Sequence, residues 1–160
     1  MTKPHVITVA GHGHDPYDVT VGAGVSSLLA SAVPGDAEKV LIVHPPVLHA
    51  RAEAMREELS SSKDVFLAEI PDGESAKRLE VAGFVWGLLG QLEFGRQDAI
   101  IGFGGGATTD LAGWIAANWL RGVSVIQVPT TVLAMVDAAI GSSSARCGCM
   151  ILTATGRSSR

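Results

Sequence analysis

The stretch of the sequence with the clearest chemical meaning is Ala99 to Asp110, AIIGFGGGATTD. Three consecutive glycines, Gly104 to Gly106, have no Cβ and allow positive φ, so a ligand could come into contact with the backbone. The hydroxyls of Thr108 and Thr109 follow, where a helix is expected to begin. A strand, a glycine turn and a helix start present free N–H groups and the positive end of the helix dipole. We therefore predict a nucleotide or phosphate site at this turn.

Two other interpretations of this stretch fit less well. A purely structural turn, in which glycine only lets the helix pack closely, suits one isolated glycine better than three beside hydroxyls. The dinucleotide fingerprint of the Rossmann fold is matched in spacing by Gly102, Gly104 and Ala107. That fingerprint needs an acidic residue about 20 residues later, at the end of the next strand. Here that strand ends with Gln127, Val128 and Pro129.

A second polar segment, PDGESAK, runs to Lys77 and lies at an expected strand-to-helix junction. Capping explains Asp72 and Glu74, because a carboxylate at a helix N-terminus is stabilised by roughly 0.3–1 kcal/mol. Lys77 is not explained in this way, since the helix dipole repels a cation in the first turn. We therefore expect Lys77 to contact a ligand.

Further candidate residues follow the next strand. Thr130 and Thr131 come before the apolar run VLAMVDAAI, where an N-cap would account for one hydroxyl and a ligand for the other. Asp137 lies within that apolar helix. A carboxylate buried there must be paired or functional, because burying it alone is costly.

Apolar periodicity and breaker residues predict the elements that position these groups. Strands are expected at residues 5–10, 17–21, 40–43, 65–70, 99–102 and 123–128, and helices at 26–32, 48–59, 75–92, from 108 onward, and at 132–140. The first two strands should form a pair. The alternation that follows implies a right-handed, mostly parallel sheet covered by helices on both faces. Ligands of such sheets bind at the carboxyl ends of the strands, whereas Arg121 precedes a strand and should lie at the opposite edge.

Composition limits the function classes. A chain of 160 residues with 47% hydrophobic residues fits one domain, and its mean hydropathy of +0.31 suggests that apolar surface meets another domain or subunit. A net charge of −4 without a basic patch argues against nucleic acid. No apolar run is long enough to span a membrane, and no signal peptide is recognisable, so we expect a cytoplasmic protein. Cys147 with Cys149, and His12 with His14, have too few partners to predict a disulfide framework or a metal site.

Three motifs together resemble the N-terminal NAD-binding domain of 3-dehydroquinate synthase: PDGESAK, GGGATTDLAGWIAANWLRGV and QVPTTVLAMVDAAIG. The resemblance covers about residues 5–141. It implies a metal-dependent carbon-oxygen lyase of the shikimate pathway that converts the small-molecule substrate 3-deoxy-D-arabino-heptulosonate 7-phosphate to 3-dehydroquinate and phosphate. In that family NAD accepts a hydride from the substrate and later returns it, zinc or cobalt serves as the metal, and the enzyme is a homodimer.

The resemblance also assigns roles to residues. It implies a catalytic role for Asp137 near the substrate, and for Arg121, which would reach the substrate phosphate from the partner subunit. The positions that it implies for cofactor binding are Asp72, Gly73, Glu74, Ser75, Ala76, Lys77, Gly104, Gly105, Gly106, Ala107, Thr108, Thr109, Asp110, Thr130 and Thr131.

The chain departs from the family after residue 141. The family continues with a Gly-Gly-Lys-Thr-Gly loop, whereas this chain has Ser143 where the lysine belongs. We expect an NAD-binding α/β domain at residues 1–141, a disordered tail at residues 142–160, and no metal ligands, because the family's zinc-binding glutamate and histidines lie in a second, helical domain. The expected fragment binds NAD weakly and is inactive alone. Alternatives are another sugar phosphate cyclase of the same superfamily and a noncatalytic nucleotide-binding module.

Overall fold

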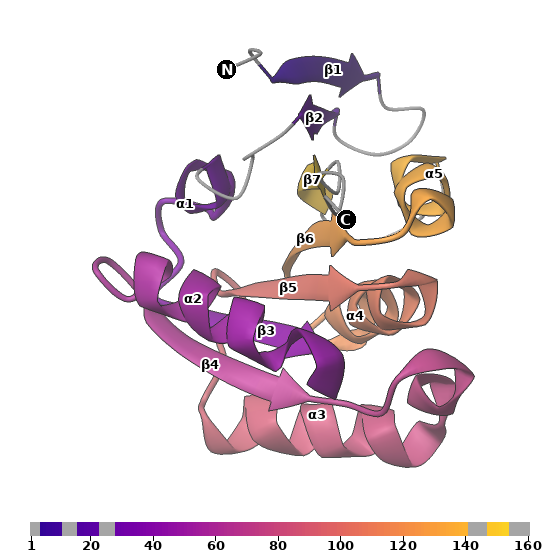
Figure 1. Ribbon diagram of the computed structural model, residues 1–160. Coiled ribbons are helices and arrows are strands. Elements are labelled where there is room, and N and C mark those ends of the chain that lie inside the picture. The colour runs from indigo at the N-terminus through magenta and orange to yellow at the C-terminus, as the bar shows by residue number, and fades with distance from the viewer. Residues whose placement is uncertain (1–3, 11–15, 23–27, 141–146, 154–160) are drawn as a thin grey trace.

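The computed structural model describes residues 4–10, 16–22, 28–140 and 147–153. A seven-stranded sheet in the order β1-β2-β7-β6-β5-β3-β4 forms its centre (Figure 1). The strands are β1 (His5–Val9), β2 (Tyr17–Gly22), β3 (Lys39–His44), β4 (Asp64–Glu69), β5 (Ala99–Gly104), β6 (Ser124–Pro129) and β7 (Cys147–Thr153). The helices are α1 (Leu29–Ala32), α2 (His49–Leu59), α3 (Leu79–Gln91), α4 (Gly106–Asn118) and α5 (Val132–Ile140), with 3-10 turns η2 (Pro46–Leu48) and η3 (Gly73–Lys77).

The sheet confirms the predicted α/β class. Strands β1 and β2 pair antiparallel at one edge, and every other pairing in the sheet is parallel. The central strand β5 is buried along its whole length. Such continuous apolar strands are typical of parallel sheets whose two faces are both covered by helices.

Helices cover both faces of the sheet and form two large cores, besides a small cluster of Tyr17 and Val19. Helices α3 and α4 pack on the face that carries Leu41 and Ile100. The opposite face carries Ile42 and Ile101, which pack with α1 and α2. Because successive side chains of a strand point to opposite faces, neighbouring residues of β3 and β5 contribute to different cores.

Several element boundaries differ from the expected ones by a residue or two, and two differences concern the carboxyl edge of the sheet. The helix expected at residues 75–92 is broken at Arg78, whose backbone is extended (φ −89°, ψ 147°), so η3 and α3 are separate elements. The break lets η3 pack beside α4 with Ala76 fully buried. Strand β5 continues past Gly102 to Gly104, because Gly104 still pairs with Pro129 of β6.

The segment expected to be a disordered tail contributes a strand. Strand β7 lies between β2 and β6 and runs parallel to both, so the sheet does not end at the expected boundary, residue 141. The apolar run CMIL within β7 is a composition that suits a strand in the middle of a sheet. Ser143 and the pair His12 and His14 lie outside the described residues.

Candidate nucleotide site

Three connections meet at the carboxyl edge of the sheet, as the sequence predicts. They lead from β4 to η3, from β5 to α4 and from β6 to α5. The last two are held side by side, because the Thr130 N–H donates to the Gly104 carbonyl at 2.8 Å. Figure 1 shows α4 and α5 beginning beside each other at the ends of β5 and β6. Two helix N-termini therefore lie at the same edge.

The start of α4 has the features of an anion cradle. Gly105 is the N-cap, and its carbonyl accepts from the N–H groups of Thr108 and Thr109 at 3.1 Å each. No side chain caps this helix, so its geometry leaves the N–H groups of Gly106 and Ala107 without an intrahelical acceptor. A Cβ at Gly106 would meet nothing within 4 Å. The helix start thus combines two N–H groups that lack an intrahelical acceptor with a glycine whose Cβ direction is open.

The three glycines match the expectation only in part. Among described glycines only Gly73 and Gly122 have positive φ, so none of Gly104 to Gly106 needs its left-handed freedom. Gly104 is required for packing, because a Cβ there would lie 2.8 Å from the Cβ of Thr108. Only Gly105 and Gly106 leave the backbone open to a ligand.

Two of the four threonine hydroxyls at the site form hydrogen bonds within the fold. Thr108 and Thr109 are buried, and the Thr109 Oγ1 donates to the Gly106 carbonyl at 3.0 Å. The Thr131 Oγ1 accepts from the Ala134 N–H at 3.2 Å and so caps α5. Thr130 is partly exposed at the sheet edge. The structure therefore brings the predicted threonines together but turns several of them inward.

Lys77 has a structural partner that the sequence argument lacked. It lies in the last turn of η3, where the helix dipole favours a cation, so the reason given for its ligand role is wrong. Its Nζ is 3.0 Å from Asp110 Oδ2 and 3.5 Å from Glu74 Oε1. The hydrogen bond to Asp110, reinforced by the negative charge, raises the pKa of Lys77 above 10.5. The pair lines a pocket of about 370 Å³ whose apolar wall includes Leu79 and Trp114.

The rest of the PDGESAK segment shapes the turn before α3. Asp72 Oδ1 accepts from the Gly73 N–H at 2.8 Å, and Ser75 Oγ donates to the Asp72 carbonyl at 2.6 Å. Gly73 has φ +62°, a conformation that favours glycine. These contacts place Glu74 and Lys77 beside α4.

The two predicted catalytic residues lie apart from the glycine turn. Asp137 is exposed on α5, so the expectation that its carboxylate is buried is wrong. The inward side of α5 carries the apolar residues Ala134, Met135 and Ala138, which leaves Asp137 on the outer side. Arg121 is exposed in the turn between α4 and β6, at the predicted opposite edge of the sheet.

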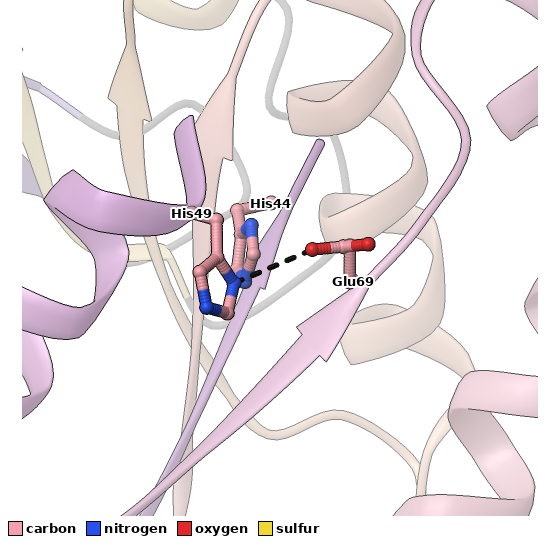
Figure 2. Close-up of side chains that lie close together, drawn as sticks. All are labelled: His44, His49 and Glu69. Atoms are coloured by element: carbon pink, nitrogen blue, oxygen red, sulfur yellow. Dashed lines mark ion pairs between the residues drawn. The ribbon is translucent and has the colours of Figure 1, made fainter. Parts of the chain in front are cut away.

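One cluster of side chains at the carboxyl edge was not predicted from the sequence. His44, His49 and Glu69 lie together at the ends of β3 and β4 (Figure 2). Both His44 and Glu69 end their strands, and the parallel register pairs them directly. The predicted strands, residues 40–43 and 65–70, end within one residue of His44 and Glu69, but the register that pairs these two residues does not follow from the sequence alone.

Among the described residues, no helix combines the length and the apolar character that crossing a membrane requires.

Comparisons with known proteins identify the family of the chain. Residues 67–146 match the family described as 3-dehydroquinate synthase N-terminal. The chain is 54% identical over 129 residues to the 3-dehydroquinate synthase of Leifsonia xyli subsp. xyli, an alignment that covers 81% of this chain and 36% of that protein. The chain thus spans a little over a third of the length of the curated relatives that it matches.

Solved structures share the fold. A 2-deoxy-scyllo-inosose synthase in complex with carbaglucose-6-phosphate, NAD+ and Co2+ superposes with a TM-score of 0.77 at 22% identity, covering 94% of this chain and 46% of that one. A 2-epi-5-epi-valiolone synthase from Streptomyces hygroscopicus subsp. jinggangensis with NAD+ and Zn2+ bound has a TM-score of 0.72 at 22% identity, covering 91% and 45%.

Proposed function

The chain belongs to the 3-dehydroquinate synthase N-terminal family, and from this premise we propose that it is the NAD-binding part of a 3-dehydroquinate synthase. The whole enzyme would convert 3-deoxy-D-arabino-heptulosonate 7-phosphate to 3-dehydroquinate and phosphate. Bound NAD would supply a reversible acceptor for hydride.

One observation supports the cofactor assignment most strongly. The backbone N–H groups of Gly106 and Ala107 have no intrahelical acceptor at the start of α4, where the helix dipole favours an anion, and a side chain at Gly106 would meet nothing within 4 Å. A dinucleotide carries its negative charge on a pyrophosphate, which such a helix start binds well. The residues present therefore fit NAD at this turn.

The neighbouring polar groups complete the proposed site. Lys77, which is paired with Asp110, supplies a cation at the rim of the proposed site. Thr130 supplies a partly exposed hydroxyl at the end of β6. Asp137 is proposed to lie near the substrate. Arg121 is proposed to serve the site of a partner subunit in a homodimer, since it lies at the opposite edge of its own sheet.

The metal of the reaction belongs to the proposal for the whole enzyme. Relatives of this fold were solved with Co2+ or Zn2+. The family resemblance places the ligands in a second domain, outside the stretch that this chain matches. A cytoplasmic location is likewise proposed from the sequence.

A second candidate is another sugar phosphate cyclase. It is favoured by the likeness of the fold to 2-deoxy-scyllo-inosose synthase. Sequence identity of 54% to a 3-dehydroquinate synthase favours the first assignment. The third candidate is a noncatalytic nucleotide-binding module. Under this candidate, NAD binds but the parent protein has no cyclase activity.

The cofactor assignment is tested by calorimetric titration of the chain with NAD. Gly106→Ala places a methyl group in the open space over the helix start without touching the fold. The matched control is Gly87→Ala in α3, which also meets nothing within 4 Å. We expect Gly106→Ala to weaken NAD binding about tenfold or more, whereas Gly87→Ala leaves it unchanged.

Equal NAD affinity in the two variants would contradict the proposed cradle. The reaction itself is tested in the parent enzyme by phosphate release from heptulosonate 7-phosphate. Release from a different sugar phosphate alone would favour the second candidate.

A further inference from the structure

The cluster of His44, His49 and Glu69 has the ligand set of a transition-metal site. One ligand atom from each residue lies within 4.8 Å of the other two. Figure 2 shows the two imidazole rings side by side, with the Glu69 carboxylate directed at them. The residues come from three elements, the ends of β3 and β4 and the first turn of α2.

His44 provides the independent sign that something binds there. Its side chain is fully buried, and its Nδ1 lies 3.0 Å from the Pro45 carbonyl. A carbonyl only accepts, so Nδ1 carries the hydrogen and the lone pair is on Nε2. Within the described part of the chain this buried Nε2 has no hydrogen-bond partner. Buried polar atoms without partners are rare and call for a ligand or an ion.

The tautomer of His44 is the one that a metal requires. Metal-binding histidines usually donate their second N–H to a carbonyl or carboxylate, which fixes the ring and makes the ligating nitrogen more basic. The Pro45 carbonyl has this role toward His44. The free Nε2 is then a preoriented ligand in the cluster.

His49 and Glu69 are already spaced as ligands. His49 Nδ1 and Glu69 Oε2 are 3.3 Å apart, close to the edge of about 3.3–3.6 Å in a tetrahedron with zinc–ligand distances of about 2.0–2.2 Å. On its other side, His49 Nε2 faces Glu53 Oε1 at 3.9 Å, so a carboxylate also stands behind the second histidine. Both side chains are about half exposed, which gives an ion access and lets them adjust toward His44.

We propose that His44 Nε2, His49 Nδ1 and the Glu69 carboxylate bind a divalent transition ion of the zinc class. Two imidazoles and one carboxylate suit Zn2+, whereas calcium and magnesium prefer all-oxygen sites. Three protein ligands leave one position for water or an exchangeable ligand. This site is distinct from the metal that the family resemblance assigns to a second domain, and it does not depend on NAD binding.

The test uses the whole chain, stripped with a chelator and titrated with Zn2+ by calorimetry and with Co2+ by absorption spectroscopy. We expect one ion per chain, a tetrahedral cobalt spectrum without a thiolate charge-transfer band, and a rise in Tm with Zn2+. Glu69→Gln and His49→Ala should each weaken binding about a hundredfold or more. They replace half-exposed side chains, so the fold should persist.

Two controls separate ligation from surface charge. Glu57→Gln removes an exposed carboxylate from α2 and should bind Zn2+ as the unmodified chain does. Glu53→Gln should weaken binding by about ten- to a hundredfold, as loss of an outer partner does. Unchanged affinity in Glu69→Gln would overturn the proposal, as would a cobalt–thiolate band, which would place the ion on Cys147 or Cys149.

The buried ligand is tested without replacing it, because substitution of His44 threatens the fold. Nitrogen NMR of the histidine rings should show hydrogen on His44 Nδ1 and a large shift of its Nε2 on adding Zn2+. A His44 Nε2 signal that zinc leaves unchanged would overturn the assignment. The assignment would also be overturned if both nitrogens of His44 carry hydrogen at neutral pH in the absence of zinc, and added zinc does not bind.

Discussion

Lys77 of η3 and Asp110 of α4 form an ion pair with 3.0 Å between Nζ and Oδ2. The pair connects the segment after β4 to the helix after β5, at the edge where both strands end. It therefore fixes the one cation of the PDGESAK motif beside the proposed NAD cradle.

This pair predicts a shifted titration of Lys77. Asp110 stabilises the charged amine, so the pKa of Lys77 lies above 10.5 and should fall toward 10.5 in Asp110→Asn. The stabilisation is fully present below pH 10.5 and is lost as the pH rises through the raised pKa. Because both side chains are largely exposed, the loss should be under about 1 kcal/mol. NMR titration of Lys77 measures the shift. Glu74 is the weaker partner, so Glu74→Gln should lower the pKa of Lys77 less than Asp110→Asn does. A pKa unaffected by Asp110→Asn would contradict the pairing.

Asp98 is predicted to be a main anchor of the opposite, amino edge of the sheet. Its buried carboxylate accepts from the N–H groups of Glu38 (3.1 Å), Lys39 (2.9 Å) and Gly95 (2.7 Å). Asp98→Ala leaves these donors unpaired and should lower the free energy of unfolding by about 3 kcal/mol. Urea denaturation measures the change. Asp36→Asn, an exposed neighbour, should stay within about 0.5 kcal/mol, and equal effects of the two variants would refute the anchoring role.

Gly104 is predicted to be intolerant of a side chain. A Cβ at this position would lie 2.7 Å from Thr108 Oγ1 and 2.8 Å from Thr108 Cβ, and neither can withdraw easily from the buried start of α4. Gly104→Ala should therefore destabilise the fold by about 1–3 kcal/mol. Gly106→Ala should be neutral or stabilising by up to about 1 kcal/mol, since its site is open. Thermal unfolding compares the two, and similar Tm values would speak against the contact with Thr108.

Ser143 is predicted from the family resemblance to limit NAD affinity. A lost charge-assisted hydrogen bond costs roughly 1.5–3 kcal/mol, which is about ten- to a hundredfold in affinity. Ser143→Lys should restore this much NAD binding by calorimetry, with Ser142→Lys as the matched control. Neither variant of the 160-residue chain should release phosphate from heptulosonate 7-phosphate above a metal-only blank. Submicromolar NAD affinity of the unmodified chain would contradict the argument.

Much of the fold follows from sequence patterns, because local apolar periodicity records which side of an element is buried. Continuous apolar runs rich in β-branched residues, such as Val40–Val43, predicted buried parallel strands, and the rule that a strand-to-helix turn follows the carboxyl end of its strand placed the glycine turn correctly. The same rule predicted the position of Arg121 at the opposite edge. The cradle depends on backbone N–H groups at a helix start, a feature that the glycine-rich motif encodes directly.

Other properties were decided only by tertiary structure, because they depend on which distant residues meet. The parallel register places His44 opposite Glu69, and the break at Arg78 turns Lys77 toward Asp110. Asp137 lies on the exposed side of α5, a helix that is apolar on most of its surface. Which side is exposed is determined by the packing of α5 on Tyr17 and Val19. The sequence determined the strands and the turn that bears free donors, whereas the side chains around them were selected by register and packing between elements far apart in the chain.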